Sequence, residues 1–234
     1  TSEKGSKQVD GSALYIPLNS SFETGSISIS ALAARNGAPL PLLPTGSLSQ
    51  TKIAELEVSN GSKKQTVQLL AQTGIGLSPS FLWATTGEKP RLFAVIAPGY
   101  MKAIEEGWEA NGEAMATIQK NAEAKVLKDW AQKLQHPLKG LTVIKNARIF
   151  DSDKATIGAP SDVYVLRGRI TAILPAGSPV RGANQELDAG GRILLPGLYD
   201  MHGHVGRWDG GLNIAAGVTT VRDLGNENAQ VQAI

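Results

Sequence analysis

The chain has 234 residues, 41% of them hydrophobic, which is enough for one or two domains with a real core. Its formal net charge is +2 and no basic stripe is present, which argues against a nucleic-acid or membrane surface. It has no cysteine, so disulfides and thiolate chemistry are excluded, and no apolar run approaches the roughly 20 residues of a membrane-spanning helix. The first residue is Thr1 rather than Met, which a removed signal peptide or a trimmed start would explain.

Residues 1–100 read as short strands separated by Gly, Pro, Ser and Asn, and we expect a small antiparallel β domain there. Residues 26–30 alternate Ser and Ile, as a strand with one buried face does. Residues 52–58 and 65–70 flank the sequence SNGS (59–62), whose Asn-Gly pair is typical of a hairpin turn. Nothing in this region has the spacing of metal ligands or of a catalytic nucleophile.

From residue 101 the spacing of apolar residues becomes helical, and we expect residues 101–140 to form a helical segment and a linker. The helical part is either one helix or two with a break near Asn111-Gly112, because Gly107 and Gly112 weaken its first turns. The apolar stripe includes Trp108 and Trp130, whose spacing indicates packing in a core rather than stacking on a ligand. His136 precedes Pro137, where a helix should stop, and we interpret this histidine as a solvated linker residue.

The region from residue 141 returns to strand-like patterns. The short runs are 141–144, 147–150, 162–166, 169–174 and 185–188, with residues 158–160 as one of the separators. The apolar stretch 192–199 looks buried. Residues 209–216 can form a short helix before the β-branched strand 217–223, and strand, helix and strand predict a βαβ unit in a parallel sheet.

The most informative stretch is LLPGLYDMHGH, residues 194–204. Alternate side chains of a β-strand share a face, so we expect Asp200, His202 and His204 on one side. Two imidazoles two residues apart can bind one metal ion, and Zn, Fe, Ni and Mn all accept such nitrogens. Because a catalytic metal usually has at least three protein ligands, the motif predicts only part of a metal centre.

Residues 141–228 resemble the N-terminal part of the amidohydrolase superfamily. The matching segments, in order, are IKNARIFD (144–151), DV (162–163), GRI (168–170), DAGG (188–191), LPGLYDMHGH (195–204) and AGVTTVRDLG (216–225). The last is most similar to the imidazolonepropionase-like and dipeptidase-like branch. Residues 1–140 are similar to N-terminal extensions of some exported members, so we expect an exported, periplasmic protein, with a cytoplasmic location as the alternative.

The resemblance implies a fold class in three parts. A β-rich N-terminal α+β region would precede residues 141–195, which would form part of a composite β-sandwich. Residues 196–234 would form the first two strands and the first βαβ unit of a (β/α)8 TIM-type barrel that is incomplete in this chain.

The resemblance also implies roles for single residues. His202 and His204 would be paired metal ligands at the carboxyl end of barrel strand 1, where barrel enzymes keep their chemistry. Asp200 would either hydrogen-bond a ligand from behind or be a buried structural carboxylate. Arg222 and Asp223 end strand 2, where we expect a structural ion pair rather than a catalytic role.

In this family one or two divalent ions activate a water molecule, and zinc is the ion we expect here. A carboxylate from strand 8 is the general base, and further ligands come from strands 4, 5 and 6. A barrel needs about 250 residues, so these strands lie outside this sequence. We therefore expect the N-terminal part of a metal-dependent amidohydrolase that hydrolyses C–N bonds in amides, cyclic amides or dipeptides and needs the missing strands for activity.

Three partners follow from this expectation. The rest of the barrel would be a second chain or a lost fragment, the substrate would be a small-molecule amide or peptide, and homo-oligomers are compatible with the pattern. The alternative function is a non-catalytic binding or structural module with a vestigial amidohydrolase segment.

Overall fold

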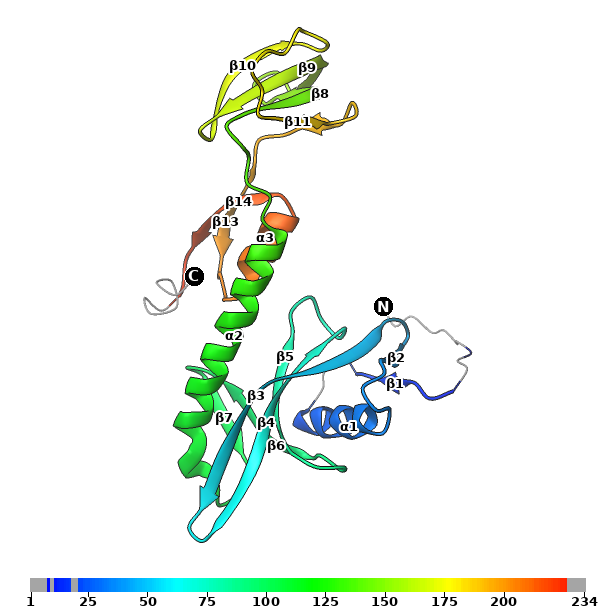
Figure 1. Ribbon diagram of the computed structural model, residues 1–234, viewed down its shortest axis with the longest axis vertical. Coiled ribbons are helices and arrows are strands. Elements are labelled where there is room, and N and C mark those ends of the chain that lie inside the picture. The colour runs from blue at the N-terminus through cyan, green and yellow to red at the C-terminus, as the bar shows by residue number, and fades with distance from the viewer. Residues whose placement is uncertain (1–7, 9–10, 18–20, 227–234) are drawn as a thin grey trace. The chain divides into compact units, whose positions relative to one another are not determined.

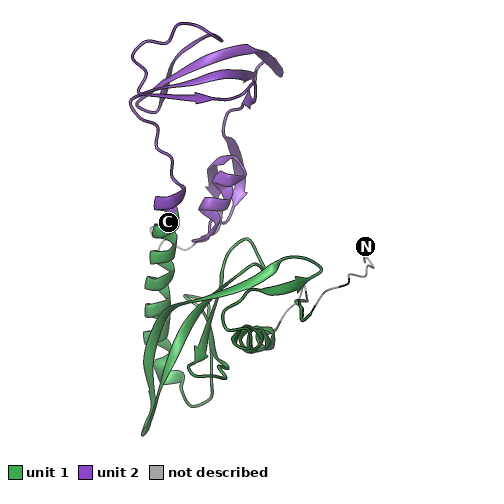
Figure 2. Cartoon of the chain, turned by 45° about the vertical axis from the view of Figure 1, so that its right-hand side comes forward, with its two compact units in different colours: residues 1–130 green, residues 131–234 purple. Residues whose placement is uncertain are grey.

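The computed structural model describes residue 8, residues 11–17 and residues 21–226 of the chain. The chain divides into two compact units, residues 1–130 and residues 131–234 (Figure 2). Both units are rich in β-strands and contain few helices, as the sequence predicts. Among the described residues, no helix combines the length and apolar character needed to cross a membrane.

The first unit is built on a seven-stranded sheet in the order β1 to β7 (Figure 1). The strands are β1 (Leu14–Tyr15), β2 (Leu40–Leu43), β3 (Ser47–Asn60), β4 (Lys63–Thr73), β5 (Ser80–Thr85), β6 (Leu92–Ala97) and β7 (Met101–Ile104). Neighbours are antiparallel except for β1 and β2, which run parallel. The predicted hairpin is confirmed, because Asn60 pairs with Lys63 and leaves Gly61 and Ser62 as a two-residue loop.

Helices cover both faces of this sheet (Figure 1). They are α1 (Phe22–Ala33) and α2 (Gly112–Leu134), the latter preceded by the 3-10 turn η1 (Glu109–Asn111). Leu69 of β4 belongs to the same core cluster as Met115 of α2, whereas the next residue, Leu70, clusters with Ile29 of α1. Because successive side chains of a strand point to opposite faces, α1 and α2 lie on opposite faces. Burial on both faces explains the uninterrupted apolar run in this part of β4.

Two expectations about where the helices of the first unit lie are wrong. Residues 26–30 lie in α1 rather than in a strand, since Ile29 and Leu32, three positions apart, are both buried on one helical face. The long helix begins at Gly112 rather than at residue 101, because residues 101–104 pair with β6 as strand β7.

The two tryptophans of the predicted stripe differ in burial. Trp108 is buried, and its ring meets Phe93 edge to face with centroids 5.7 Å apart, which confirms its place in the core. Trp130, in contrast, is 39% exposed, so the expectation that it lies in the core is wrong.

The second unit contains a five-stranded sheet and a separate two-stranded sheet. The five strands are β8 (Leu141–Asp151), β9 (Thr156–Leu166), β10 (Arg169–Pro175), β11 (Gln185–Asp188) and β12 (Ile193–Leu194). The strands β8, β9 and β10 form an antiparallel meander, and β11 and β12 pair in parallel with β8. Residues 158–160, expected as a separator, lie within β9 because Pro160 pairs with Arg148 of β8.

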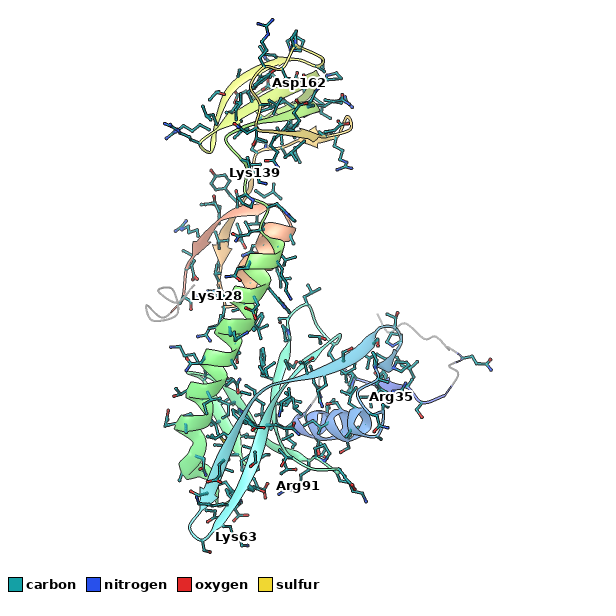
Figure 3. The ribbon with its side chains drawn as sticks, in the orientation of Figure 1. Arg35, Lys63, Arg91, Lys128, Lys139 and Asp162 are labelled. Carbon is teal, nitrogen blue, oxygen red and sulfur yellow. The ribbon has the colours of Figure 1, made fainter. Side chains whose placement is uncertain are left out.

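Asp162, one of the residues that carry the family resemblance, is fully buried in this sheet (Figure 3). Its carboxylate accepts the main-chain N–H groups of Asn146 and Gly177 at 2.9 and 3.1 Å. A buried carboxylate needs such partners. Asp162 therefore ties two irregular segments of the backbone to β9, which is a structural role.

Candidate metal centre

The βαβ unit predicted after residue 196 is present (Figure 1). Strand β13 (Leu198–Gly203) runs parallel to β14 (Val218–Asp223), and helix α3 (Asp209–Ala215) lies between them in the chain. Parallel strands need such a crossover connection, and their carboxyl ends meet at one edge. The N–H of Leu224 donates to the Gly203 carbonyl at 3.3 Å, so the segments that leave the two strands lie side by side.

The pairing of these strands is irregular next to the histidines. Asp200 pairs with Val221 and Gly203 with Asp223, so three steps along β13 match two along β14. Such a bulge interrupts the alternation of side chains, and a Cβ built on Gly203 would lie 3.3 Å from Asp200 Oδ2. The Asp200 carboxylate thus lies beside Gly203, and its Oδ1 accepts the main-chain N–H of His202 at 3.0 Å. That Asp200 supports a metal-binding histidine by a hydrogen bond to its side chain stays a prediction.

His202 and His204 come together at the end of β13. Their ring centroids are 5.6 Å apart with an interplanar angle of 72°, and both residues are exposed. His204 Nδ1 lies 3.2 Å from the Gly225 carbonyl oxygen. Because a carbonyl can only accept, Nδ1 carries the proton in this hydrogen bond, which leaves the lone pair on Nε2. A neutral imidazole with a free lone pair is the form that binds a divalent ion.

Asp223, the last residue of β14, links the segments that follow both strands. Its carboxylate accepts hydrogen bonds from the Asn226 side-chain amide at 2.7 Å and from the N–H groups of Val205 and Gly225 at 3.0 and 3.1 Å. These bonds, led by that of Asn226, outweigh desolvation and hold the pKa of Asp223 below its usual range, with a smaller contribution from the nearby His204.

Other expectations around the site are wrong. Within the described residues Asp223 is bound by amides and forms no ion pair with Arg222. The stretch 192–199, which looks buried in the sequence, is largely exposed: Leu195 is 57%, Leu198 53% and Tyr199 70% exposed. No residue between 198 and 226 is buried. The βαβ unit therefore lacks the cover that parallel strands normally have on both faces.

The two imidazoles fit part of a metal-ligand set. Their nitrogens are the right donors for zinc and related ions, and the Gly225 carbonyl holds His204 in the orientation and tautomer that metal-ligating histidines usually have. In the described part of the chain, however, no three His, Asp or Glu side chains are placed to hold an ion together. Two ligands are fewer than a catalytic metal site usually has, and the assignment of His202 and His204 as metal ligands stays a prediction.

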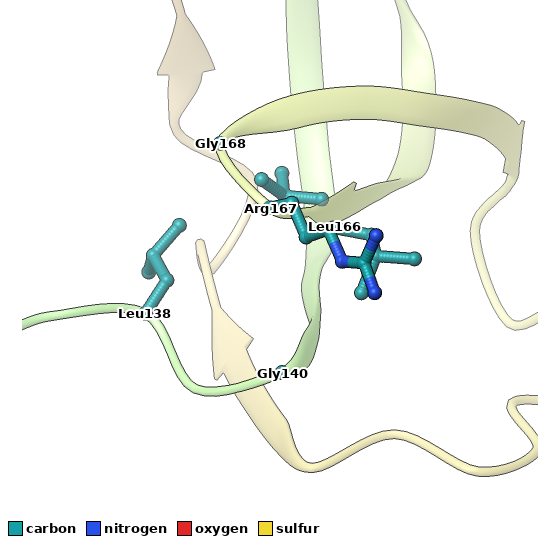
Figure 4. A pocket seen from close by; sticks show the side chains of 6 residues that line it. Leu138, Gly140, Leu166, Arg167 and Gly168 are labelled. Carbon is teal, nitrogen blue, oxygen red and sulfur yellow. The ribbon is translucent and has the colours of Figure 1, made fainter.

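A pocket of about 350 Å³ lies elsewhere in the second unit, at the turn between β9 and β10 (Figure 4). Its lining residues are Leu138, Gly140, Val165, Leu166, Arg167 and Gly168. Neither His202 nor His204 lines it, so it is separate from the candidate metal centre.

Comparison with known proteins finds similarity over part of the chain. No protein-family profile matches. An adenine deaminase of Chelativorans sp. is 40% identical over 63 residues, which are 27% of this chain and 10% of that enzyme. An L-hydantoinase of Paenarthrobacter aurescens is 36% identical over 63 residues, 13% of its length, and an allantoinase of Streptomyces avermitilis is 40% identical over 75 residues, 17% of its length.

Solved structures give matches of similarly limited extent. The L-hydantoinase (dihydropyrimidinase) from Arthrobacter aurescens aligns with 36% of this chain and 20% of its own, at 29% identity and a TM-score of 0.31. A prolidase complexed with N-methylphosphonate-L-proline aligns with 40% of this chain and 28% of its own, at 23% identity and a TM-score of 0.32. At these scores the structures establish no common overall fold. The sequence matches nevertheless show that this chain, over about a quarter of its length, is related to the amidohydrolase superfamily.

Proposed function

We propose that this chain supplies the first metal-binding strand of a metal-dependent hydrolase that cleaves C–N bonds in small amides, cyclic amides or dipeptides. The observation that carries the proposal is the pair His202 and His204, side by side where β13 ends beside β14. The carboxyl ends of parallel strands are where barrel enzymes place their catalytic groups. The names of the relatives, a deaminase, a hydantoinase and an allantoinase, support chemistry at C–N bonds.

In this proposal the complete site holds one or two divalent ions, with zinc as the expected metal. His202 and His204 bind one of these ions. When bound, such an ion lowers the pKa of a water molecule and polarises a carbonyl oxygen. The chain itself contributes two nitrogen ligands, and the hydrogen bond from His204 Nδ1 to Gly225 keeps the other nitrogen of that ring available. The general base and the remaining ligands would come from further barrel strands.

The exposed βαβ unit supports a need for those further strands. Strands β13 and β14 have no buried residue, although parallel sheets are normally covered on both faces. A second polypeptide or another segment of the same protein would complete the barrel, and residues 141–195 would contribute to its β-sandwich. The place of action that we propose is the periplasm.

Metal binding is the direct test. Zinc titration of the 234-residue chain should show an affinity that falls strongly in His202→Ala and in His204→Ala, because each variant removes one of two ligands. His136→Ala is the matched control, since it removes the third histidine of the sequence, which lies outside the βαβ unit, and should bind zinc like the parent chain. Equal zinc affinity in all four proteins would show that the ligand assignment is wrong.

Hydrolysis separates the enzyme from its alternative. The protein with its remaining strands should cleave at least one of a hydantoin, allantoin, adenine or a dipeptide, and a chelator should abolish that activity. If the completed protein holds no zinc and cleaves none of them, the non-catalytic module with a vestigial amidohydrolase segment is the better description.

A further inference from the structure

We propose that the segment 223–226, here called the clasp, is a positioning element for the His204 imidazole, with Asp223 as its centre. The clasp sets which ring nitrogen of His204 carries the proton. The proposal rests on the proposed function only in treating His204 as a metal ligand. Its main test, the tautomer of the ring, needs no metal.

The clasp joins the two chain segments on either side of His204. Asp223 Oδ2 accepts the N–H of Val205, the residue after His204, and also the Asn226 side-chain amide. The same amide donates to the Val205 carbonyl at 2.8 Å. Both polar groups of the Val205 backbone are thus bound by the clasp, which fixes the chain directly after the histidine.

Gly225 completes the contact with the ring. Asp223 Oδ1 accepts its N–H at 3.1 Å, and its carbonyl accepts from His204 Nδ1 at 3.2 Å. A Cβ on Gly225 would lie 3.4 Å from His204 Nδ1 and 3.1 Å from His204 Cε1, and the second distance is shorter than most Cβ contacts. The absence of a side chain therefore lets the carbonyl reach the imidazole.

Asp223 acts through Gly225 rather than on the ring itself. The distance from Asp223 Oδ1 to His204 Nδ1 is 3.9 Å, which is too long for a hydrogen bond. An ionised carboxylate is acceptor-only and can satisfy all three donors at once. In Asp223→Asn, the NH2 group of the new side chain would face at least one of these three donors and could not accept its hydrogen bond. We therefore expect this substitution to loosen the position of the Gly225 carbonyl.

The decisive measurement is the pair of imidazole 15N chemical shifts of His204 in the 234-residue chain, taken above the usual histidine pKa of about 6.5 so that the ring is neutral. We expect the parent chain to show the tautomer with the proton on Nδ1. In Asp223→Asn, Asn226→Ala and Gly225→Ala the two shifts should move toward their average, because the carbonyl no longer selects one tautomer. The shifts of His202 should stay unchanged and serve as an internal reference.

Asp188→Asn is the matched control. Asp188 Oδ1 accepts the N–H of Gly190, two residues on, at 2.8 Å, in the same local turn that Asp223 makes with Gly225, but in the five-stranded sheet. This variant should leave the His204 shifts unchanged. If Asp223→Asn fails to fold, Asn226→Ala decides, since it keeps the carboxylate and removes its shortest hydrogen bond.

A folded Asp223→Asn chain with the parent's His204 tautomer overturns the proposal, and so does a folded Asn226→Ala chain with that tautomer where Asp223→Asn does not fold. Loss of residues that orient a metal-binding histidine typically weakens metal affinity about 10- to 100-fold, and we expect a loss of this size for zinc in the clasp variants. If the completed protein binds no zinc, the proposed function fails, while the tautomer measurement on the 234-residue chain still decides the role of the clasp.

Discussion

The side chain of Gln119, in α2, forms hydrogen bonds with three groups: the Trp83 indole N–H, the Ile96 carbonyl and the Glu123 carboxylate. Its side-chain oxygen accepts from Trp83 Nε1 at 3.0 Å, and its amide nitrogen donates to the Ile96 carbonyl at 2.9 Å and to Glu123 at 2.8 Å. Gln119 and Trp83 are almost completely buried. Because buried polar groups are costly unless they are paired, this glutamine fixes the position of α2 on the sheet.

Replacing Gln119 should therefore destabilise the first unit. We expect Gln119→Ala to lower the free energy of unfolding by about 1–3 kcal/mol, since it leaves the Trp83 N–H and the Ile96 carbonyl without this partner. Urea unfolding followed by tryptophan fluorescence measures the change. The exposed Gln132 of the same helix supplies the control, and Gln132→Ala should stay within about 0.5 kcal/mol of the parent chain. Equal stability of the two variants would contradict the assigned role.

Among the elements of the first unit, the turn after β4 depends on one glycine. Gly74 has φ of +110°, and a Cβ there would overlap the main-chain oxygen of Ser47, at the start of β3. Gly87, in the turn between β5 and β6, has nearly the same φ, +106°, but open space around the Cβ position. Both glycines thus have a positive φ that disfavours other residues, but only at Gly74 does a neighbouring main chain leave no room for a Cβ.

This difference separates backbone strain from a steric clash. Gly87→Ala should cost about 1–3 kcal/mol, the usual penalty for a side chain in a sparsely populated conformation. Gly74→Ala should cost clearly more, because β3 and β4 must also move apart. Denaturant unfolding of the two variants tests the comparison. If Gly74→Ala were no more destabilising than Gly87→Ala, the clash with Ser47 would contribute nothing to the cost of the substitution, which contradicts the prediction.

The molecule as a whole is unevenly buried. The first unit has its core between a sheet and helices on both faces, whereas β13, α3 and β14 contain no buried residue. Local opening is easiest where few apolar contacts hold the backbone, so the two regions should differ in hydrogen exchange. We expect amides of β13 and β14 in the 234-residue chain to exchange much faster than those of β4 and β5, measured peptide by peptide by mass spectrometry. Equal protection would mean that the βαβ unit is covered without further strands.

Local sequence signals predicted the elements whose causes are local. The hairpin at residues 59–62 follows from its turn residues, although the loop is Gly61-Ser62, with Gly61 at φ of +59°, and Asn60 is the last residue of β3. The βαβ unit follows from strand, short helix and strand in sequence. Residues 26–30 misled because five alternating residues also fit a helix in which Ile29 and Leu32 face the sheet. Whether this segment forms a strand or a helix was decided by the surface that it packs against.

The same division holds at the candidate site. The sequence by itself determined that His202 and His204 lie near each other, because they are two residues apart at the end of one strand, and that about a quarter of the chain is similar to amidohydrolases. Only the tertiary structure showed that Asp223, Gly225 and Asn226 bind the chain at His204. The sequence Asp-Leu-Gly-Asn at the end of β14 is a turn signal, but it does not say which segment the turn contacts. The physical reason is that the clasp depends on parallel pairing across some 20 residues, which brings the end of β14 to the end of β13.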